Sequence, residues 1–358
     1  LNFNKVRILH TADLHIESAL TAFKSAAEIR RAELLDIFGK IIDTAKSENV
    51  DVLIIAGDLF NSCRPSKPAV SYVKRKLESI PEVKVFITTG NHDYSLNIDF
   101  PENVFLFSNG IKKYEFESFD FYGAGFQSEY CDSNMLKNFS VENPGKINIL
   151  AFHGDIVEKG QTSRYNPVTR EELSETGADY VALGHVHQFT GINCVNNVSY
   201  AYCGIPEGRG FDELGKKGVI IGDVYKNRVD LKFLPVCKRE CIETNIDITG
   251  CGDYDEICSK IYECAIGGQN IFKINLCGTV ENQFFLNTNF IEERIKNDYF
   301  YVKVIDLTRP EIDIDMLKEE YSLRGLFVKK LSEQNGSEEA LRFGLGAISG
   351  EKVYFNDN

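Results

Sequence analysis

Five short polar motifs, each directly behind a short apolar run, constrain the fold of this 358-residue chain more than any other feature. The motifs are Asp13-Leu-His15, Gly57-Asp58, Gly90-Asn-His-Asp93, His153-Gly154 and Gly184-His-Val-His187. Together they hold five of the six histidines in the chain. In α/β proteins, ligand-binding groups gather beyond the carboxyl ends of strands. The pattern therefore predicts five strands that deliver their following residues to one edge of a sheet.

The apolar runs have the length and composition of buried strands, and helical sequences separate the first of them. The runs lie at 6–10, 52–56, 83–88, 147–152 and 180–183. Between the first two runs, residues 26–48 carry a helical apolar face that includes Ile37, Phe38 and Ile41. Residues 67–80 also read as a helix. This alternation predicts a layered α/β fold.

After about residue 191 the pattern changes to strands that no helices separate. These runs lie at 198–202, 219–224 and 229–234. We expect them to close a second sheet against the first.

A domain boundary is expected near 235–240, because strands and helices alternate again beyond it. The expected strands are 242–248, 271–277 and 300–306, and the expected helices are 254–265 and 290–297. One or two helices are expected over 314–335, and a last one over 338–348 with Ser337 as its N-cap. We therefore predict a first domain over 1–237 and a smaller α/β cap domain over 238–358.

The charge balance limits how this chain can bind nucleic acid. Its 40 basic and 53 acidic residues give a net charge of −13. A protein that bound nucleic acid through bulk charge would be basic. Contact with DNA would thus need a local patch or bound cations. The basic residues considered for such a patch are Arg64, Lys112, Lys113, Arg164, Arg209, Lys216 and Lys217. The alternative for each is a solvated surface charge.

The apolar runs, the first residues and the cysteine spacing together predict a cytoplasmic protein with reduced cysteines. No run of 18 apolar residues is present, which argues against a membrane span. The first residues show no basic segment followed by an apolar one, so no signal peptide is expected. Eight of the ten cysteines lie between Cys194 and Cys277, but no Cys-x-x-Cys pair occurs. This spacing disfavours a zinc ribbon, and reduced thiols are expected.

The residue types in the five motifs indicate a metal centre. Carboxylate, amide and imidazole ligands suit Mn²⁺, Fe²⁺ or Zn²⁺. Two metal ions about 3.5–4 Å apart need a shared ligand, and a carboxylate can bridge them. In an extended segment His185 and His187 would share a face, one for each metal. Each motif alone also fits an ordinary turn, whereas five in this order indicate a site. We expect His10 to be a packing or supporting residue.

The series of motifs resembles the calcineurin-like metallophosphoesterase superfamily. Three segments that begin at His10, Gly57 and Leu183 resemble its DNA repair exonuclease branch, the SbcD-like nucleases and their YhaO-like relatives. The stretch 202–218 and the segment 323–328 resemble the same branch. The resemblance implies a four-layer fold, in which two packed β-sheets are flanked by helices and followed by the smaller cap.

The resemblance also implies two sets of metal ligands that share Asp58. The first set is Asp13, His15, Asp58 and His187. The second set is Asp58, Asn91, His153 and His185. His92 would face the substrate and act as general acid toward the leaving oxygen, with Asp93 orienting it. A hydroxide bridging two divalent ions, with Mn preferred and Fe or Zn as alternatives, would be the nucleophile.

The resemblance implies a Mn-dependent 3′–5′ DNA exonuclease acting in DNA repair, which is the expected function. The alternative is a phosphatase or phosphodiesterase for a small-molecule or phosphoprotein substrate, since a fold does not fix a substrate. A non-catalytic partner-binding subunit is a third reading, disfavoured because every ligand position is intact.

The expected partners are DNA and a coiled-coil ATPase of the SbcC type, with a homodimer also open. In the last helix, Leu341, Phe343, Leu345 and Ile348 fit either a docking face for such a partner or ordinary core.

Overall fold

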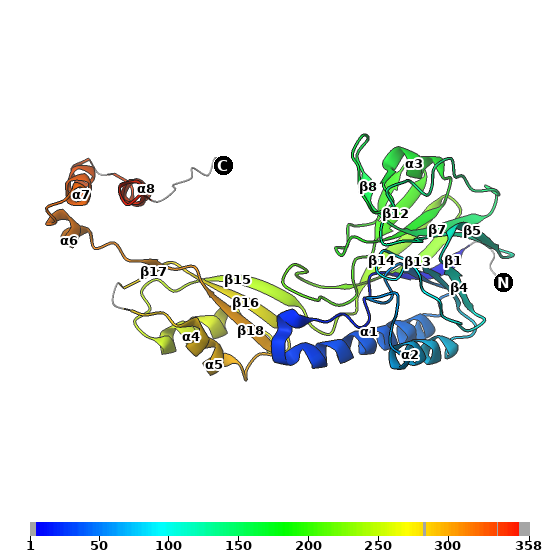
Figure 1. The fold of residues 1–358 in the computed structure, drawn as a ribbon, viewed down its shortest axis with the longest axis horizontal. Coiled ribbons are helices and arrows are strands. Elements are labelled where there is room, and N and C mark those ends of the chain that lie inside the picture. Colours follow the sequence, from blue (N-terminus) through cyan, green and yellow to red (C-terminus); the bar gives the residue numbers. More distant parts are fainter. Residues whose placement is uncertain (1–4, 282–283, 335, 351–358) are drawn as a thin grey trace. The chain divides into compact units, whose positions relative to one another are not determined.

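The computed structural model describes residues 5–281, 284–334 and 336–350. A six-stranded mixed sheet begins the fold (Figure 1). Its strand order is β14-β13-β1-β2-β3-β4, and β1 to β4 run parallel. The bounds are β1 (Val6–Thr11), β2 (Val52–Ala56), β3 (Lys84–Thr88), β4 (Val104–Phe107), β13 (Gly218–Tyr225) and β14 (Arg228–Pro235).

A second six-stranded sheet has the order β11-β12-β10-β7-β6-β5. Its strands are β5 (Gly110–Glu115), β6 (Phe119–Gly125), β7 (Ile147–His153), β10 (Tyr180–Gly184), β11 (Asn193–Val195) and β12 (Val198–Tyr202). Strands β6, β7, β10 and β12 run parallel.

The expectation that three late strands would close this second sheet is wrong for two of them. Only β12 joins it, whereas β13 and β14 extend the first sheet beyond β1. Leu9 pairs with Ile221 in that antiparallel ladder. Strand β13 is buried on both faces, so its sequence pattern does not say which neighbour it pairs with.

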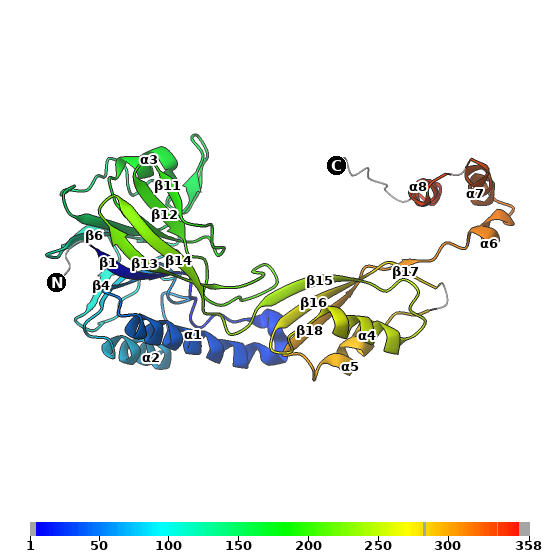
Figure 2. The same ribbon diagram turned by 180° about the vertical axis from the view of Figure 1, so that it is seen from behind.

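Helices and sheets alternate in four layers, which confirms the expected metallophosphoesterase architecture. Helices α1 (Ala27–Ser47) and α2 (Lys67–Glu78) lie side by side on the outer face of the first sheet (Figure 2). Short helix α3 (Arg170–Glu175) packs on the outer face of the second sheet. The N-terminus of α2 is capped by the Ser66 hydroxyl, which accepts a hydrogen bond from the Ala69 N–H.

Strands of the first sheet bury both faces because neighbouring side chains enter two different cores. Ile8 and Ile54 face the second sheet, in a core shared with Phe121. Leu9 and Ile55 point the other way and pack against α1 and α2. This alternation explains why the strands are continuous apolar runs.

The remaining helices and short strands lie, in the sequence, either between the strands of the two large sheets or after them. They are η1 (Thr21–Ala26), β8 (Ile156–Val157), β9 (Val168–Thr169), α4 (Tyr254–Cys264), β17 (Thr279–Val280), α5 (Thr288–Ile295), β19 (Arg309–Pro310), α6 (Ile314–Lys318), α7 (Leu323–Glu333) and α8 (Glu338–Ile348). A three-stranded sheet has the order β15-β16-β18, formed by β15 (Cys241–Asp247), β16 (Ile271–Cys277) and β18 (Tyr301–Asp306).

The chain divides into two compact units. The first holds the chain up to Thr244 together with Ala265–Ile274 and Glu292–Lys303. The second holds Asn245–Cys264, Asn275–Ile291 and the chain from Val304 onward. The domain boundary at residue 237 remains a prediction.

The last helices form a small core of their own. Helix α8 has the predicted bounds, and the Ser337 hydroxyl accepts the Ala340 N–H as its N-cap. Leu341 and Leu345 are buried against Leu317 and Val328. These two leucines therefore belong to a core and not to a docking face.

Phe86 occupies the centre of the layer between the two sheets, which predicts a large cost for its removal. Its ring stacks on Phe121 with ring centroids 3.6 Å apart. Phe86→Ala should lower the free energy of unfolding by about 3–5 kcal/mol, because it leaves a cavity in a closed core. Urea unfolding followed by tyrosine fluorescence measures the change. The control Ile29→Ala, at a side chain that is 54% exposed, should stay within about 0.5 kcal/mol. Equal effects would contradict the layered core.

Candidate metal centre

The five motifs meet where β1, β2 and β3 of the first sheet and β7 and β10 of the second end. The expected single sheet edge is therefore a junction of two sheets. Backbone hydrogen bonds join the loops, from Asp13 N–H to Gly57 O (3.1 Å) and from His15 N–H to Asp58 O (2.9 Å). Both oxygens of the Asp13 carboxylate accept the His185 N–H, at 3.1 and 3.0 Å, which ties the two sheets together.

Tight packing of this junction requires glycine at two positions. A Cβ atom at Gly57 would collide with the His153 ring, and Gly57 also has a φ of 92°. A Cβ atom at Gly90 would collide with the Asp58 carboxylate. The glycines of these motifs thus let the backbone approach the ligand side chains.

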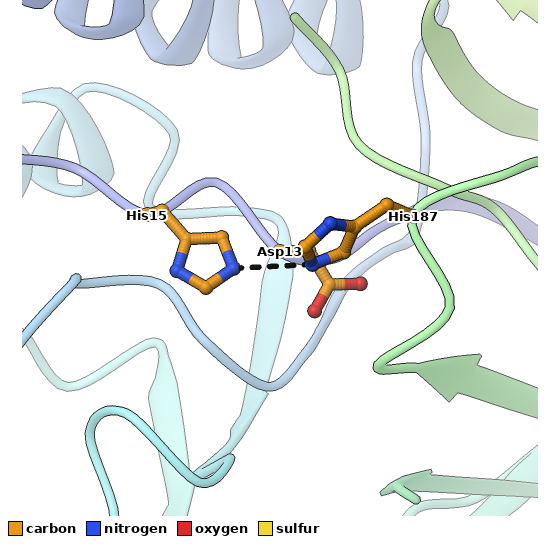
Figure 3. A group of neighbouring side chains, drawn as sticks. All are labelled: Asp13, His15 and His187. Atoms are coloured by element: carbon orange, nitrogen blue, oxygen red, sulfur yellow. Dashed lines mark hydrogen bonds between the residues drawn. The ribbon is translucent and has the colours of Figure 1, made fainter. Parts of the chain in front are cut away.

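The first cluster brings together Asp13, His15 and His187 (Figure 3). One ligand atom from each lies within 4.8 Å of the others. The Nε2 atoms of His15 and His187 are 3.4 Å apart, and the Asp13 carboxylate points into the same space. Asp13 and His15 are buried, whereas His187 is partly exposed. Three members of the first predicted ligand set are thus neighbours.

The second cluster brings together Asn91, His153 and His185 with Asp58. The His153 Nε2 atom lies 3.0 Å from Asn91 Oδ1, 3.3 Å from His185 Nδ1 and 3.5 Å from Asp58 Oδ2. The other ring nitrogen, His153 Nδ1, is 3.1 Å from the Ala56 carbonyl oxygen, to which it donates. This bond turns Nε2 toward the cluster, where a metal ion would take the place of a proton. The Asp58 and Asp13 carboxylates outweigh the effect of burial and raise the pKa of His153. The structure thus brings together the second predicted ligand set.

Asp58 lies between the two clusters. Its Oδ2 atom is 3.7 Å from His15 Nε2 and 3.5 Å from His153 Nε2. Its Oδ1 atom accepts the backbone N–H of His92 at 2.9 Å. A carboxylate in this position can contact two cations at once, as the bridging assignment requires.

The two histidines of the last motif reach different clusters by a route that the sequence did not predict. His185 has a φ of 103°, so the chain leaves the strand there and does not continue as an extended segment. Its Nδ1 atom faces His153, and its Nε2 atom lies 3.5 Å from Asp155 Oδ1.

His92 is exposed beside the clusters, and Asp93 is buried behind it. A ring nitrogen of His92 lies within 4.8 Å of ligand atoms of His15 and Asp58. The Asp93 carboxylate accepts the backbone N–H groups of Gly90 (2.8 Å) and Phe60 (3.2 Å). Asp93 therefore holds the backbone of the loop that presents His92.

Burial and neighbouring charges set the protonation of the cluster. Burial, aided by Arg209, lowers the pKa of His15 well below its usual range. Burial and the neighbouring His153 lower the pKa of His185 to about 4. Burial also raises the pKa of Asp13. At neutral pH the His15 and His185 rings are therefore uncharged and have a lone pair to offer.

The donor set fits a pair of divalent cations. Burial, with a smaller contribution from the neighbouring Asp58 carboxylate, raises the pKa of Asp13, and a nearby cation would favour its charged form. Imidazole, amide and carboxylate donors together suit Mn²⁺, Fe²⁺ or Zn²⁺. Asn91 adds an oxygen to the histidine nitrogens of the second cluster.

Sequence reasoning missed Glu213 as a site residue. Its Oε1 atom is 2.8 Å from His187 Nδ1. Hydrogen bonds from His187 and Arg209 outweigh burial and lower the pKa of Glu213 to about 2. From the sequence, Arg209 is only a candidate DNA contact, with a solvated surface charge as the alternative. The one signal in the sequence was the stretch 202–218, which resembles the repair exonucleases without indicating a role for any one residue.

Three of the other candidate residues have partners within the protein. His10 is fully buried, burial lowers its pKa to about 3, and its Nδ1 atom lies 2.9 Å from the Tyr180 hydroxyl. Lys113 pairs with Glu142 at the surface, and the buried Lys217 donates to Gln188 Oε1.

A loop beside the centre carries one of the exposed basic residues. Arg164 stacks on Tyr130, 3.5 Å from its ring centroid. The next residue, Tyr165, has its ring centroid 4.4 Å from that of His185. The exposed residues Arg64 and Lys216 also remain available for contact with a ligand.

Comparison with known proteins identifies the class. The Calcineurin-like phosphoesterase family matches residues 6–189. The metallophosphoesterase YhaO of Bacillus subtilis is 28% identical over 243 residues, which are 63% of this chain and 59% of that protein. The DNA double-strand break repair protein Mre11 of Methanopyrus kandleri is 24% identical over 226 residues, 56% of this chain and 49% of that protein. A subunit of the nuclease SbcCD of Rhodobacter capsulatus is 38% identical over 103 residues, 28% of this chain and 24% of that protein.

The chain therefore belongs to the calcineurin-like phosphoesterase family, whose members are metal-dependent hydrolases. Its similarity to proteins named as a nuclease subunit and a repair protein confirms the resemblance to the repair exonuclease branch. The matched stretches span between about a quarter and three fifths of these relatives. Across the described residues, none of the helices is both long and apolar enough to cross a membrane.

The position of Asp58 between the clusters predicts that one substitution disturbs both metal ions. Asp58→Asn should weaken the binding of both metal ions, because the neutral amide lacks the negative charge that the two cations would share. Metal analysis after dialysis against Mn²⁺ and gel filtration measures the stoichiometry. The control Asp179→Asn alters a buried carboxylate that pairs with Lys226, away from the centre, and should leave the stoichiometry at the wild-type value. If Asp58→Asn bound as many metal ions as the wild type, the bridging role of Asp58 would be wrong.

Proposed function

We propose that this chain is a Mn²⁺-dependent DNA exonuclease of 3′–5′ polarity that acts in DNA repair. The observation that carries the proposal is the complete donor set around Asp58 with the exposed His92 ring beside it. Similarity to Mre11 and to an SbcCD nuclease subunit supports DNA as the substrate. Oxygen and imidazole donors are compatible with Mn²⁺, and Fe²⁺ or Zn²⁺ are the alternatives.

Two metal ions would be held by residues of both sheets. The first would take Asp13, His15, Asp58 and His187, and the second Asp58, Asn91, His153 and His185. When bound, such a pair lowers the pKa of a coordinated water to supply a nucleophile near neutral pH, and neutralises charge on the phosphoryl oxygens.

Other residues of the chain would orient the ligands, donate a proton and contact the phosphates. The His153 bond to the Ala56 carbonyl sets the tautomer of that ligand before any ion binds. His92 lies outside the two ligand sets, and its exposed ring can give a proton to the departing sugar oxygen. Asp93 keeps His92 in place through the backbone of the 90–93 loop. Exposed Arg64 and Arg164 are available to meet backbone phosphates near the centre.

His92→Ala should retain both metal ions and lose about 10²–10⁴-fold in the rate of DNA hydrolysis, the usual contribution of a general acid. The assay uses the metal-free chain, Mn²⁺ and linear duplex DNA labelled at either the 3′ or the 5′ end. A ladder that shortens from the 3′ end supports the stated polarity. Wild-type rates in His92→Ala would show that His92 is not the acid.

A small diester with a nitrophenolate leaving group separates the two substrate hypotheses. This leaving group departs without protonation, so His92→Ala should lose less activity on it than on DNA. Brisk hydrolysis of the diester with no cleavage of DNA would favour the alternative, a phosphodiesterase for small molecules or phosphoproteins.

A coiled-coil ATPase of the SbcC type is the partner that we propose for the C-terminal helices. Helices α6 and α7 expose apolar side chains, among them Met316 (63%), Leu323 (66%) and Leu326 (58%). Exposed apolar residues that gather on neighbouring helices are typical of a protein interface. Similarity to a protein named as a nuclease subunit supports this choice of partner.

Met316→Asp with Leu326→Asp should weaken this association at least tenfold, because charges would be buried in an apolar interface. Co-expression with the SbcC-type ATPase of the same organism, followed by gel filtration, measures it. The control Ile29→Asp introduces the same charge at an exposed apolar residue of the first unit and should leave the complex intact. If both variants co-elute like the wild type, α6 and α7 are not the docking surface. Elution of the chain alone at twice its mass would favour a homodimer.

A further inference from the structure

One imidazole nitrogen of His187 is turned away from the metal cluster and toward a carboxylate. His187 Nδ1 lies 2.8 Å from Glu213 Oε1, whereas His187 Nε2 faces His15 Nε2 at 3.4 Å. Arg209 Nη2 lies 3.1 Å from the same Nδ1 atom and 3.0 Å from Glu213 Oε1. Two acceptor atoms would repel each other at 2.8 Å, so Nδ1 carries the proton and donates to Glu213 Oε1, and Arg209 Nη2 donates to that oxygen as well. The lone pair is then on Nε2, the atom that points into the cluster.

Glu213 is itself held rigidly. Its Oε2 atom accepts the backbone N–H of Arg209 at 2.6 Å, and its Oε1 atom accepts Arg209 Nη2 at 3.0 Å. The side chain of Glu213 is 5% exposed and that of Arg209 is 18% exposed. An almost buried carboxylate with three donors around it remains ionised and has little freedom to turn.

The loop that carries these two residues is anchored to α1 by buried charges. Glu207 Oε1 lies 2.7 Å from Arg30 Nη1, and both side chains are fully buried. Arg30 Nη2 also donates to the Gly208 carbonyl oxygen at 2.7 Å. Glu207 Oε2 accepts the backbone N–H of Lys238 at 2.6 Å, which ties the loop to the following chain segment. The anchor lies next to the residue pair that holds His187.

We propose that Glu213 is a positioning residue for the metal ligand His187, and that Arg209 fixes the Glu213 carboxylate. Glu213 sets the tautomer and the ring orientation of His187, so that its Nε2 atom faces the cluster. The proposal rests on the metal centre of the proposed function and is independent of DNA as the substrate. Among the four histidines of the two ligand sets, His153 is oriented by a backbone carbonyl, whereas His187 depends on a side chain that a mutation can remove.

Calorimetric titration of the metal-free chain with MnCl₂ tests the proposal without any substrate. Glu213→Ala should weaken one of the two Mn²⁺ sites by about 10–100-fold and leave the other at the wild-type affinity, because partners of ligand histidines typically have effects of this size. Glu213→Asp keeps the charge on a shorter side chain and should recover part of the loss. Glu172→Ala, at the capping-box glutamate of α3, removes a hydrogen-bonded carboxylate elsewhere and should leave both sites unchanged.

A double variant that combines Glu213→Ala with His187→Ala distinguishes a positioning role of Glu213 from a general loss of stability. The double variant His187→Ala, Glu213→Ala should bind Mn²⁺ at its remaining site as His187→Ala does, because Glu213 acts through His187 alone. Further loss in the double variant would overturn the proposal. Circular dichroism of each metal-free variant checks the fold, and Glu213→Gln replaces Glu213→Ala if the latter does not fold.

Two results distinguish this proposal from the proposed function. If the wild-type chain bound fewer than two Mn²⁺ ions, the two-metal centre of the proposed function would be contradicted. Two wild-type sites that Glu213→Ala leaves unchanged would overturn the role of Glu213 and leave the metal pair standing.

Discussion

The contacts between the loops and the proposed metal centre both depend on two buried carboxylates at the junction of the two sheets. Asp13 and Asp58 are 1% and 2% exposed, and such groups are costly to bury unless they bind partners. Asp13 accepts the His185 N–H, and Asp58 accepts the His92 N–H. The first bond joins the ends of β1 and β10, which belong to different sheets, and the second joins the ends of β2 and β3 within the first sheet. The same carboxylates face the metal clusters, Asp58 through its other oxygen, Oδ2, so the fold and the metal centre depend on the same groups.

Around these carboxylates, the roles proposed for three of the histidines follow from their hydrogen-bond partners and their exposure. The lone pair of His153 is directed by the Ala56 carbonyl, and that of His187 by Glu213. His92 has the exposed position that its proposed role as general acid requires, and the Asp93 carboxylate accepts backbone N–H groups that hold its loop. Family membership agrees with this division, because metal-dependent phosphoester hydrolysis needs ligands, a nucleophile source and an acid.

Supporting groups reach the centre from distant parts of the chain. Arg209 and Glu213 come from the loop after β12, and that loop is fixed to α1 through Arg30 and Glu207. Removing one partner of such a buried pair typically costs about 3–5 kcal/mol, because the other charge is then left without compensation. The ligand geometry at His187 therefore depends on packing well outside the metal cluster.

The sequence by itself determined the apolar strands, the long helices and the polar residues behind the strands. Local patterns such as the run 52–56, the Ser337 cap and the Gly90-Asn-His-Asp93 motif depend only on neighbouring residues. Tertiary structure alone decided that β13 and β14 join the first sheet, because strand pairing depends on partners far along the chain. It also decided that Glu213 faces His187 and that Lys217 turns inward. A single glutamate or lysine has no local signal for its partner, since that contact exists only after the sheets have packed.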